Sequence, residues 1–373
     1  MRSVAARYGV RLAAVQRWVV RAKGRRLDRV DWQDRPSAPR KTRHIGAAMQ
    51  RRILQIRRHL REHSVLGEYG AAAIHRELEA RKATPCPSLR TIGRILQRWG
   101  ALDGRRRTRR SPPPAGWYLP EVARGLAELD SFDTIEGLAI RRGTHLTVLT
   151  GISLHGGLPA AWPEASLSSR HVVERLQEHW RQFGLPAYAQ FDNDNRFLGP
   201  KQHADTVGRV CRLCLSLGVT PVFVPPNEMG FQAAIESFNG RWQAKVWSRF
   251  VHRSLPALQS RSCQYLDAVR QRLAPRREAA PLRDDFPPNW QLDLQQHPQG
   301  TLIYLRRTND SGHASLLGRT FLVDHHWVHR LVRAEADLHH HRIRFYALRR
   351  RAPTEQPLLH EITYRLPKRP FKE

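Results

Sequence analysis

The sequence predicts a multidomain protein with two α-helical units, a central α/β domain built on a mixed sheet, and a C-terminal small β-barrel. Three observations support this organisation. The chain has 373 residues, too many for one compact core. Its apolar pattern is helical up to about residue 104, alternates between strand and helix from about residue 118, and consists of short strands from about residue 296. Its basic charge is concentrated in the first 110 residues.

The charge distribution indicates a polyphosphate partner. Lys and Arg number 63 against 33 Asp and Glu, which gives a net charge of +30. Residues 1–110 hold 29 basic and 8 acidic side chains, residues 111–250 hold 13 of each, and residues 251–373 hold 21 and 12. Arginines that neutralise phosphates release condensed counterions, so basic flanks around a neutral middle are typical of nucleic-acid-binding modules beside a chemical core.

Several function classes are disfavoured by what the composition lacks. Four cysteines are too few and too scattered for a disulfide framework. No apolar run reaches membrane-spanning length, and the N-terminus has no signal-peptide core. No glycine loop of the phosphate-cradling kind occurs, so ATP-driven chemistry is not expected. We therefore expect a cytoplasmic, nucleoid-associated protein without a membrane partner.

The first 33 residues predict a helix-turn-helix unit. Ala5 is small enough for two helices to approach, and Gly9 permits the sharp turn between them. Val15 and Trp18 are expected to pack the second helix. The motif begins almost at the first residue, without the helix that commonly precedes it, so we expect either that the true start lies upstream or that the unit is truncated. The side chains expected to face DNA from the second helix are Arg11, Gln16, Arg17 and Arg21.

Residues 34–104 predict a second helical unit of the same kind. Apolar residues from Met49 to Leu60 mark one helix, and Ile74 and Leu78 mark the next. Ser88 is a typical N-cap for a third helix. The side chains expected to face a DNA groove from this third helix are Arg90, Arg94 and Gln97.

A basic, proline-rich linker follows at residues 105–117. Five arginines within six residues repel one another in water and are expected to settle along a phosphate backbone, and the prolines after them stiffen the chain. The linker residues assigned to DNA binding are Arg105, Arg106, Arg107, Arg109 and Arg110. The remaining predicted boundaries are 118–255 for the catalytic core, 256–295 for a connector and 296–373 for the small β-barrel.

Three carboxylates stand where elements of the central domain end. Asp130 lies on the first predicted strand, Asp192 follows a short strand, and Glu236 opens a long helix. Cleavage of a phosphodiester needs hard oxygen ligands that converge on Mg²⁺, because the metal activates the nucleophile and stabilises the leaving oxygen. Acids at strand ends are common, so spacing alone also leaves Asp133 and Asp194 open as members of such a site.

The residues around these acids resemble a known family. Asp192 and Asn193 are followed by Phe197, then by the stretch 212–226, and then by Ile235-Glu236-Ser237-Phe238-Asn239. This pattern resembles the catalytic domain of the retroviral-type integrase family, in particular bacterial insertion-sequence transposases with two N-terminal helix-turn-helix units. Upstream, Leu129 and Asp130 with Gly143 match the family's first strand and hairpin, and the two ends of the chain are similar to its flanking domains.

The resemblance implies a ribonuclease-H-like core with an Asp-Asp-Glu triad at Asp130, Asp192 and Glu236. It implies two Mg²⁺ ions, with Mn²⁺ as a substitute, and a polynucleotidyl transferase reaction in which water and then a DNA 3′-hydroxyl is the nucleophile. It also implies double-stranded DNA partners, namely terminal inverted repeats and a target, and a homodimer or tetramer on that DNA. The family's register favours Asp130 over Asp133, and Phe197 favours Asp192 over Asp194.

Two departures from the family pattern keep other functions open. The family commonly has Asn-Gly after the second aspartate, where this chain has Asn193-Asp194, and Asn-Gly shortly before the glutamate, where it has Phe231-Gln232. Glycine permits a close backbone approach to DNA, so its loss would weaken activity. The alternatives are a catalytically weakened DNA-binding regulator derived from such an element, and a structure-selective nuclease of the same core fold.

Overall fold

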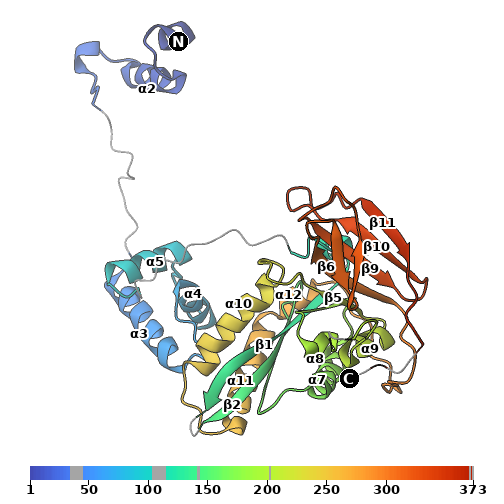
Figure 1. Cartoon of the computed structure of the whole chain (residues 1–373). Helices are drawn as coiled ribbons and strands as arrows, with labels where there is room; N and C mark the ends of the chain where they lie inside the picture. The colour runs from blue at the N-terminus through green and yellow to red at the C-terminus, as the bar shows by residue number, and fades with distance from the viewer. Residues whose placement is uncertain (34–44, 103–114, 141–142, 201–202, 369–370, 372–373) are drawn as a thin grey trace. The chain divides into compact units, whose positions relative to one another are not determined.

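The computed structural model describes residues 1–33, 45–102, 115–140, 143–200, 203–368 and 371. The chain divides into two compact units, Met1–Leu54 and Gln55–Glu373 (Figure 1). No helix among the described residues is long and apolar enough to cross a membrane. The predicted linker arginines lie outside the described residues; they are Arg105, Arg106, Arg107, Arg109 and Arg110.

The N-terminal unit begins with the two expected helices, α1 (Arg2–Arg7) and α2 (Leu12–Ala22), followed by the short helix η1 (Leu27–Arg29). Gly9 lies in the turn between α1 and α2 with a φ of 63°, a backbone conformation that glycine adopts without strain. Ala5 and Val15 are buried as predicted, whereas Trp18 is 41% exposed and does not pack into a core. The residues assigned to DNA binding on α2 lie at its start and along its length: Arg11, Gln16, Arg17 and Arg21.

The second helical unit contains α3 (Ala47–His63), α4 (Ala71–Ala80) and α5 (Leu89–Arg98). Ser88 caps α5 as predicted, because its hydroxyl accepts a hydrogen bond from the backbone N–H of Thr91 at 3.4 Å. The apolar stripe of α5 is buried, and its other side is open to solvent. The exposed polar residues of that side include Arg90, Arg94 and Gln97.

A nine-stranded mixed sheet organises the rest of the chain, with strand order β11-β10-β9-β6-β5-β4-β1-β2-β3. β1, β2 and β3 are antiparallel neighbours, and β4 and β5 run parallel to β1. This is a mixed α/β fold that is compatible with a ribonuclease-H-like core. The five strands of this part are β1 (Leu129–Ile140), β2 (Thr144–Ser153), β3 (Pro159–Glu164), β4 (Tyr188–Phe191) and β5 (Thr220–Phe223).

Helices cover both faces of this part of the sheet (Figure 1). Side chains of β1 alternate between the faces, so Phe132 packs in the cluster with α7 and α9, and Ile135 packs in the cluster with α10 and α11. The first face carries α7 (Ser169–Phe183), α8 (Asn195–Leu198) and α9 (Arg209–Ser216), and the second carries α10 (Ala233–Trp242), the π-helical turn η2 (Gln243–Trp247) and α11 (Leu255–Arg272). The remaining short helices are α6 (Pro120–Ala123) and α12 (Ala274–Glu278).

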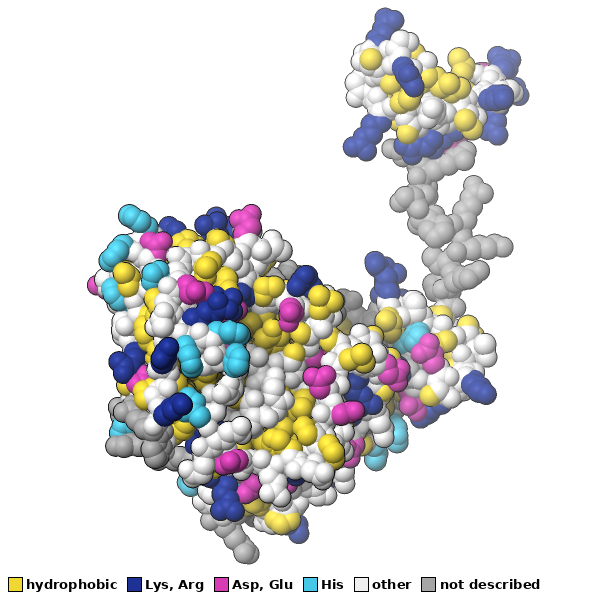
Figure 2. Space-filling model, turned by 90° about the vertical axis from the view of Figure 1, so that its right-hand side faces the viewer, with side chains coloured by type: hydrophobic (Ala, Val, Ile, Leu, Met, Phe, Trp, Pro, Cys, Tyr) yellow, Lys and Arg dark blue, Asp and Glu magenta, His cyan; other side chains and the backbone are white. Residues whose placement is uncertain are grey.

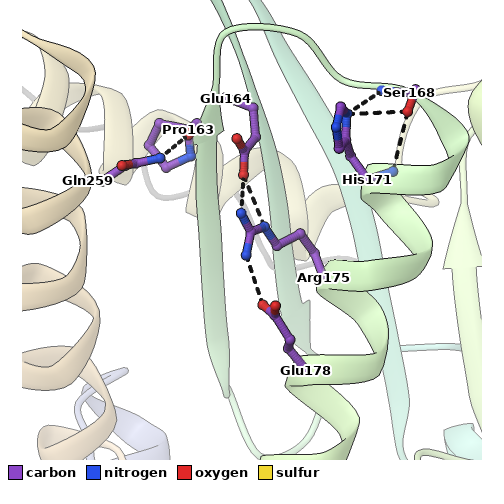
Figure 3. A network of polar contacts seen from close by, with 7 residues as sticks. All are labelled: Pro163, Glu164, Ser168, His171, Arg175, Glu178 and Gln259. Carbon is purple, nitrogen blue, oxygen red and sulfur yellow. Dashed lines mark hydrogen bonds and ion pairs between the residues drawn. The ribbon is translucent and has the colours of Figure 1, made fainter.

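Polar contacts fix the edge strand β3 between helices of the two layers (Figure 3). Arg175 on α7 donates to Glu164 on β3 from Nε at 2.9 Å and from Nη2 at 2.6 Å. On the other side, the Gln259 side chain of α11 donates to the carbonyl oxygen of Pro163 at 2.9 Å. The strand was not predicted from the sequence, because its Pro163 and adjoining alanines lack the apolar alternation of a strand.

The C-terminal strands extend the same sheet and do not close into the separate small β-barrel that we expected. β6 pairs in parallel with β5, so that Val222 lies opposite Ile303 and Phe223 lies opposite Tyr304. At these positions β6 pairs with the outer side of β5. The remaining strands of this region are β6 (Thr301–Arg307), β9 (Leu331–Asp337), β10 (Arg342–Ala347) and β11 (Leu358–Thr363), with β7 (His313–Leu316) and β8 (Arg319–Leu322) as a separate hairpin.

Candidate active site

The sheet register brings Asp133 and Asp192 together. β1 and β4 are parallel, and Ser131 lies opposite Gln190. Two residues further along both strands, the register leads to Asp133 on β1 and to Asp192 directly after β4. Side chains two residues apart point to the same face of a sheet, so these two carboxylates share a face.

Helix α10 adds Glu236 to the same place. Glu236 and Asn239 are three residues apart on the helix and therefore share one of its sides. The side-chain amide of Asn239 donates to Oδ2 of Asp133 at 2.8 Å, and the backbone N–H of Thr134 donates to Oδ1 at 2.8 Å. Asn239 is buried, whereas Glu236 is exposed to solvent. The helix thus contributes one residue that holds Asp133 and one free to meet a ligand.

The pKa of Asp133 responds to the charges of the other two acids. Burial raises the pKa of Asp133, and the negative charges of Asp192 and Glu236 raise it further, to about 6. The hydrogen bonds from Thr134 and Asn239 oppose these effects without cancelling them. A carboxylate with a raised pKa beside two others is the arrangement that a bound cation would relieve.

Asp130 lies apart from the other two acids of the predicted triad, and this expectation is corrected. Its register partner on β4 is Ala189, three residues before Asp192, and its side chain lies on the opposite face from Asp133. Arg283 binds it in a bidentate ion pair, from Nη1 at 2.9 Å and from Nη2 at 2.6 Å, and the Trp180 indole donates at 3.2 Å. Burial opposes ionisation of Asp130, but the Arg283 charge outweighs it and holds the pKa of Asp130 below its usual range.

The loop after β4 gives Asp192 and Asp194 different environments. Asp194 caps α8 and accepts from the Arg196 side chain at 2.9 Å and 2.6 Å, so its carboxylate is engaged in a local ion pair. The backbone N–H of Asp194 donates to Oδ1 of Asp192 at 3.0 Å. Phe197 is buried and stacks on Phe191 at a centroid distance of 5.1 Å, which anchors the loop. Asp194 therefore shapes the loop that holds Asp192.

An open cleft of about 650 Å³ lies at this end of the sheet. Asp192 and Glu236 line this cleft, together with Glu228 from the loop between β5 and α10. Arg307 and Arg350 both pair with Glu228, and Arg350 also donates to the carbonyl oxygen of Met229 at 2.9 Å. These contacts hold the loop at the rim of the cleft.

The acids fit a divalent cation in their chemistry. Asp133, Asp192 and Glu236 offer hard carboxylate oxygens, the donors that Mg²⁺ and Mn²⁺ prefer. Burial is the main cause of the raised pKa of Asp133, and the charges of Asp192 and Glu236 add to it. Among the described residues, no three His, Cys, Asp or Glu side chains lie close enough to hold a metal ion as they stand. The carboxylates would have to draw together around an ion.

Residues 61–68, at the end of α3 and just after it, contact the catalytic domain. The Arg249 guanidinium donates to the carbonyl oxygen of Ser64 at 2.6 Å, just after the end of α3. Lys245, on the π-helical turn η2, donates to the carbonyl oxygen of Gly67 at 2.8 Å. Arg272 on α11 forms an ion pair with Glu68. These contacts fix residues 61–68 against the catalytic domain.

The residues assigned to DNA binding stand on exposed surfaces. Arg90, Arg94 and Gln97 lie on the solvent side of α5. In the N-terminal unit, Lys and Arg side chains are spread over the visible surface (Figure 2). Arg11, Gln16 and Arg17 are exposed there, while Arg21 is half-buried and donates to the carbonyl oxygen of Gln33 at 3.0 Å.

No protein-family model matches the chain, and no curated protein matches it. Among solved structures, a chain of the simian T-cell lymphotropic virus intasome in complex with PP2A regulatory subunit B56 gamma is 14% identical at a TM-score of 0.32. That match covers 52% of this chain and 63% of the other.

Two integrase catalytic core domains are also similar. For the BIV integrase core the identity is 14% and the TM-score 0.27, with 38% of this chain and 81% of the other covered. For the HTLV-2 integrase core in complex with magnesium the values are 13% and 0.29, with 37% and 86% covered. All three TM-scores are below 0.5.

Proposed function

We propose that this chain is a transposase or integrase that binds DNA and catalyses metal-dependent strand cleavage and strand transfer. The observation that carries the proposal is that the charges of Asp192 and Glu236, which line an open cleft, both act on the neighbouring Asp133, so that two parallel strands and one helix bring three acids into one region. Carboxylates on rigid elements can hold Mg²⁺ or Mn²⁺ against a phosphodiester. The triad is therefore Asp133-Asp192-Glu236, with Asp133 in the place that the sequence suggested for Asp130.

Each residue has a role that follows from its contacts. Asp133, Asp192 and Glu236 would hold two ions, which when bound activate the attacking hydroxyl and stabilise the leaving oxygen. Asn239 orients Asp133 by its hydrogen bond at 2.8 Å, and the backbone N–H of Asp194 orients Asp192. Asp130 has a structural role through Arg283.

The proposed partner is double-stranded DNA, as terminal inverted repeats and as a target. The basic N-terminal unit and the exposed arginines of α5 supply phosphate and groove contacts. Because residues 61–68 are fixed against the catalytic domain, DNA on α5 would be held at a set distance from the cleft. Joining of paired ends requires two active sites, so we propose a homodimer or tetramer that acts on the nucleoid.

A second candidate function is a DNA-binding regulator derived from such an element. It is favoured by the absence, among the described residues, of three acids close enough to hold an ion, and by Asn193-Asp194 in place of the family's Asn-Gly. The two candidates share the basic helical units and differ in whether the carboxylates act.

The decisive assay compares the wild type with Glu236→Gln on duplexes that carry the element's own ends, with Mg²⁺ or Mn²⁺. Glu236 is exposed, so its substitution should leave the fold and DNA binding intact. We expect cleavage and joining by the wild type only. If both proteins bind the ends alike and neither cleaves them, the enzyme proposal is refuted and the regulator is supported.

A further inference from the structure

A second cavity of about 520 Å³ adjoins the carboxylate cleft. Asn193 and Pro226 line both hollows, so the two share a wall. The far side of this cavity is formed by β6 and by the hairpin of β7 and β8. Its polar lining includes Arg306, Asn309 and His313, and its lining contains no Asp or Glu among the described residues. A cavity with basic and neutral polar walls lies directly beside a cleft with acidic walls.

Arg306 is the charged group of this cavity that is most deeply buried, at 8% exposure. Its Nη2 donates to Oδ1 of Asn193 at 2.9 Å, and its Nε donates to the carbonyl oxygen of Ser315 at 2.9 Å. Its Nη1 donates to the carbonyl oxygens of Val224 at 3.2 Å and Leu305 at 2.8 Å. A guanidinium has five N–H donors, so within the described chain one donor of Nη2 is left over.

The charge of Arg306 has no carboxylate partner among the described residues, because all four of these acceptors are neutral oxygens. Burial lowers the pKa of Arg306 to about 10, which records the cost of keeping this charge out of water. Arg333 on the adjacent strand β9 shows the contrast. It is buried to a similar degree, at 6% exposure, but pairs with Glu335 at 3.1 Å.

We propose that this cavity binds a phosphate group of the nucleic-acid strand that passes the carboxylates, with Arg306 as its charged ligand. A buried guanidinium without a counter-ion favours an anion, and its fork geometry suits phosphate. The shared wall at Asn193 places this anion next to the site of chemistry. The identity of the ligand rests on the proposed function, whereas the existence of the anion site rests on the cavity and on Arg306.

The site can be tested on the full-length wild type in chelator-containing buffer, so that no metal contributes. Amide hydrogen exchange is measured by mass spectrometry with millimolar thymidine 5′-monophosphate, with thymidine, and with inorganic phosphate. We expect the nucleotide to slow exchange in residues 193–200 and 305–318, phosphate to do so more weakly, and thymidine to have no effect. No protection by the nucleotide, or equal protection by thymidine, overturns the proposal.

Substitution of Arg306 then tests its role. We expect Arg306→Gln to weaken nucleotide binding about tenfold or more, because a charge-assisted hydrogen bond is lost. Arg306→Lys keeps the charge and should weaken binding less. Arg333→Gln is the matched control, since it removes a buried arginine from the neighbouring strand but leaves the cavity lining intact. Unchanged protection in Arg306→Gln contradicts the proposal, and if that variant does not fold, the wild-type and Arg306→Lys measurements decide.

The outcome is separable from the proposed function. Protection by the nucleotide without any DNA cleavage would refute the enzyme and leave the phosphate site standing. Cleavage of DNA without protection at residues 305–318 would support the enzyme and refute the phosphate site.

Discussion

The side-chain amide of Asn239 donates to the carboxylate of Asp133 at 2.8 Å, and this single contact ties the first strand of the sheet to the helix that carries Glu236. Asn239 follows Glu236 by about one helical turn. The position of Glu236 relative to Asp133 is therefore set by a buried amide and not only by the packing of the helix. The predictions below follow from this coupling and from the partners of the neighbouring residues.

Replacement of Asp133 by Asn should stabilise the protein at neutral pH. The pKa of Asp133 is raised to about 6 in the folded protein from an ordinary value of 3.8. Folding thus favours the protonated acid, and the stability it contributes is present below the unfolded pKa and is lost as the pH rises through the folded pKa. We expect Asp133→Asn to gain on the order of 1 kcal/mol above pH 6 and little near pH 4.

The measurement is denaturant unfolding of both proteins across this pH range. Asp267→Asn, which makes the same substitution at a surface position, is the control, because the Asp267 side chain is 65% exposed. A difference between Asp133→Asn and the wild type that does not change with pH would contradict the prediction.

Divalent cations should stabilise the wild type through the three carboxylates. A ligand that binds only the folded state raises the unfolding temperature, and the increase grows with the logarithm of the ligand concentration once this exceeds the dissociation constant. We expect Mn²⁺ or Mg²⁺ to raise the Tm of the wild type, and Asp133→Asn or Glu236→Gln to reduce this shift sharply. Asp130→Asn should have a lower Tm than the wild type but should show the same increase in Tm when the cation is added. Loss of the shift in Asp130→Asn alone would return Asp130 to the metal site.

Removal of the Asp130 carboxylate should destabilise the fold. It would leave the Arg283 guanidinium buried without its partner, which typically costs about 3–5 kcal/mol. We expect a large loss in the free energy of unfolding for Asp130→Asn. The double variant Asp130→Leu with Arg283→Met removes both charges and should recover part of the loss, and unfolding by denaturant would show whether it does. A single substitution without effect would mean that the pair contributes nothing to stability.

Neutralisation of Arg90 and Arg94 should weaken DNA binding in a salt-dependent manner. Each arginine that contacts a phosphate adds roughly one unit to the slope of log affinity against log salt. We expect the double variant Arg90→Gln with Arg94→Gln to reduce this slope by about two in a binding titration. Arg81→Gln, next to Glu77 at the end of α4, is a control that should leave the slope unchanged. An unchanged slope in the double variant would remove α5 from the DNA-binding surface.

The sequence predicted which strand and helix carry the site, but it did not predict which face of the strand meets the helix. The strand around Asp130 and the helix at Glu236 were both predicted, and both exist as β1 and α10. Asp130 and Asp133 lie on the same strand but on opposite faces, because three residues separate them and side chains alternate. Which face meets α10 depends on the packing of that helix, and no local pattern in β1 reports it.

Long-range pairing was the other feature that local patterns could not reveal. The short strands after residue 300 were expected, but their partner was not, because β6 pairs with β5 across roughly 80 residues of intervening chain. Arg283 and Arg306 were missed for a related reason. Each lies far in sequence from the acidic or polar residue that it contacts, Asp130 or Asn193, and an arginine among many carries no distinguishing signal.

The parallel pairing of β5 with β6 has a consequence for how this chain reaches its native state. Until β6 has been synthesised, β5 has an open edge whose backbone N–H and C=O groups are available to any other strand. The cleft lies at the end of this strand, and its rim loop would be held by Arg307 through Glu228 only after β6 has been synthesised. A nascent or prematurely terminated chain would expose an unpaired sheet edge beside the cleft, and this edge could pair with strands of other chains.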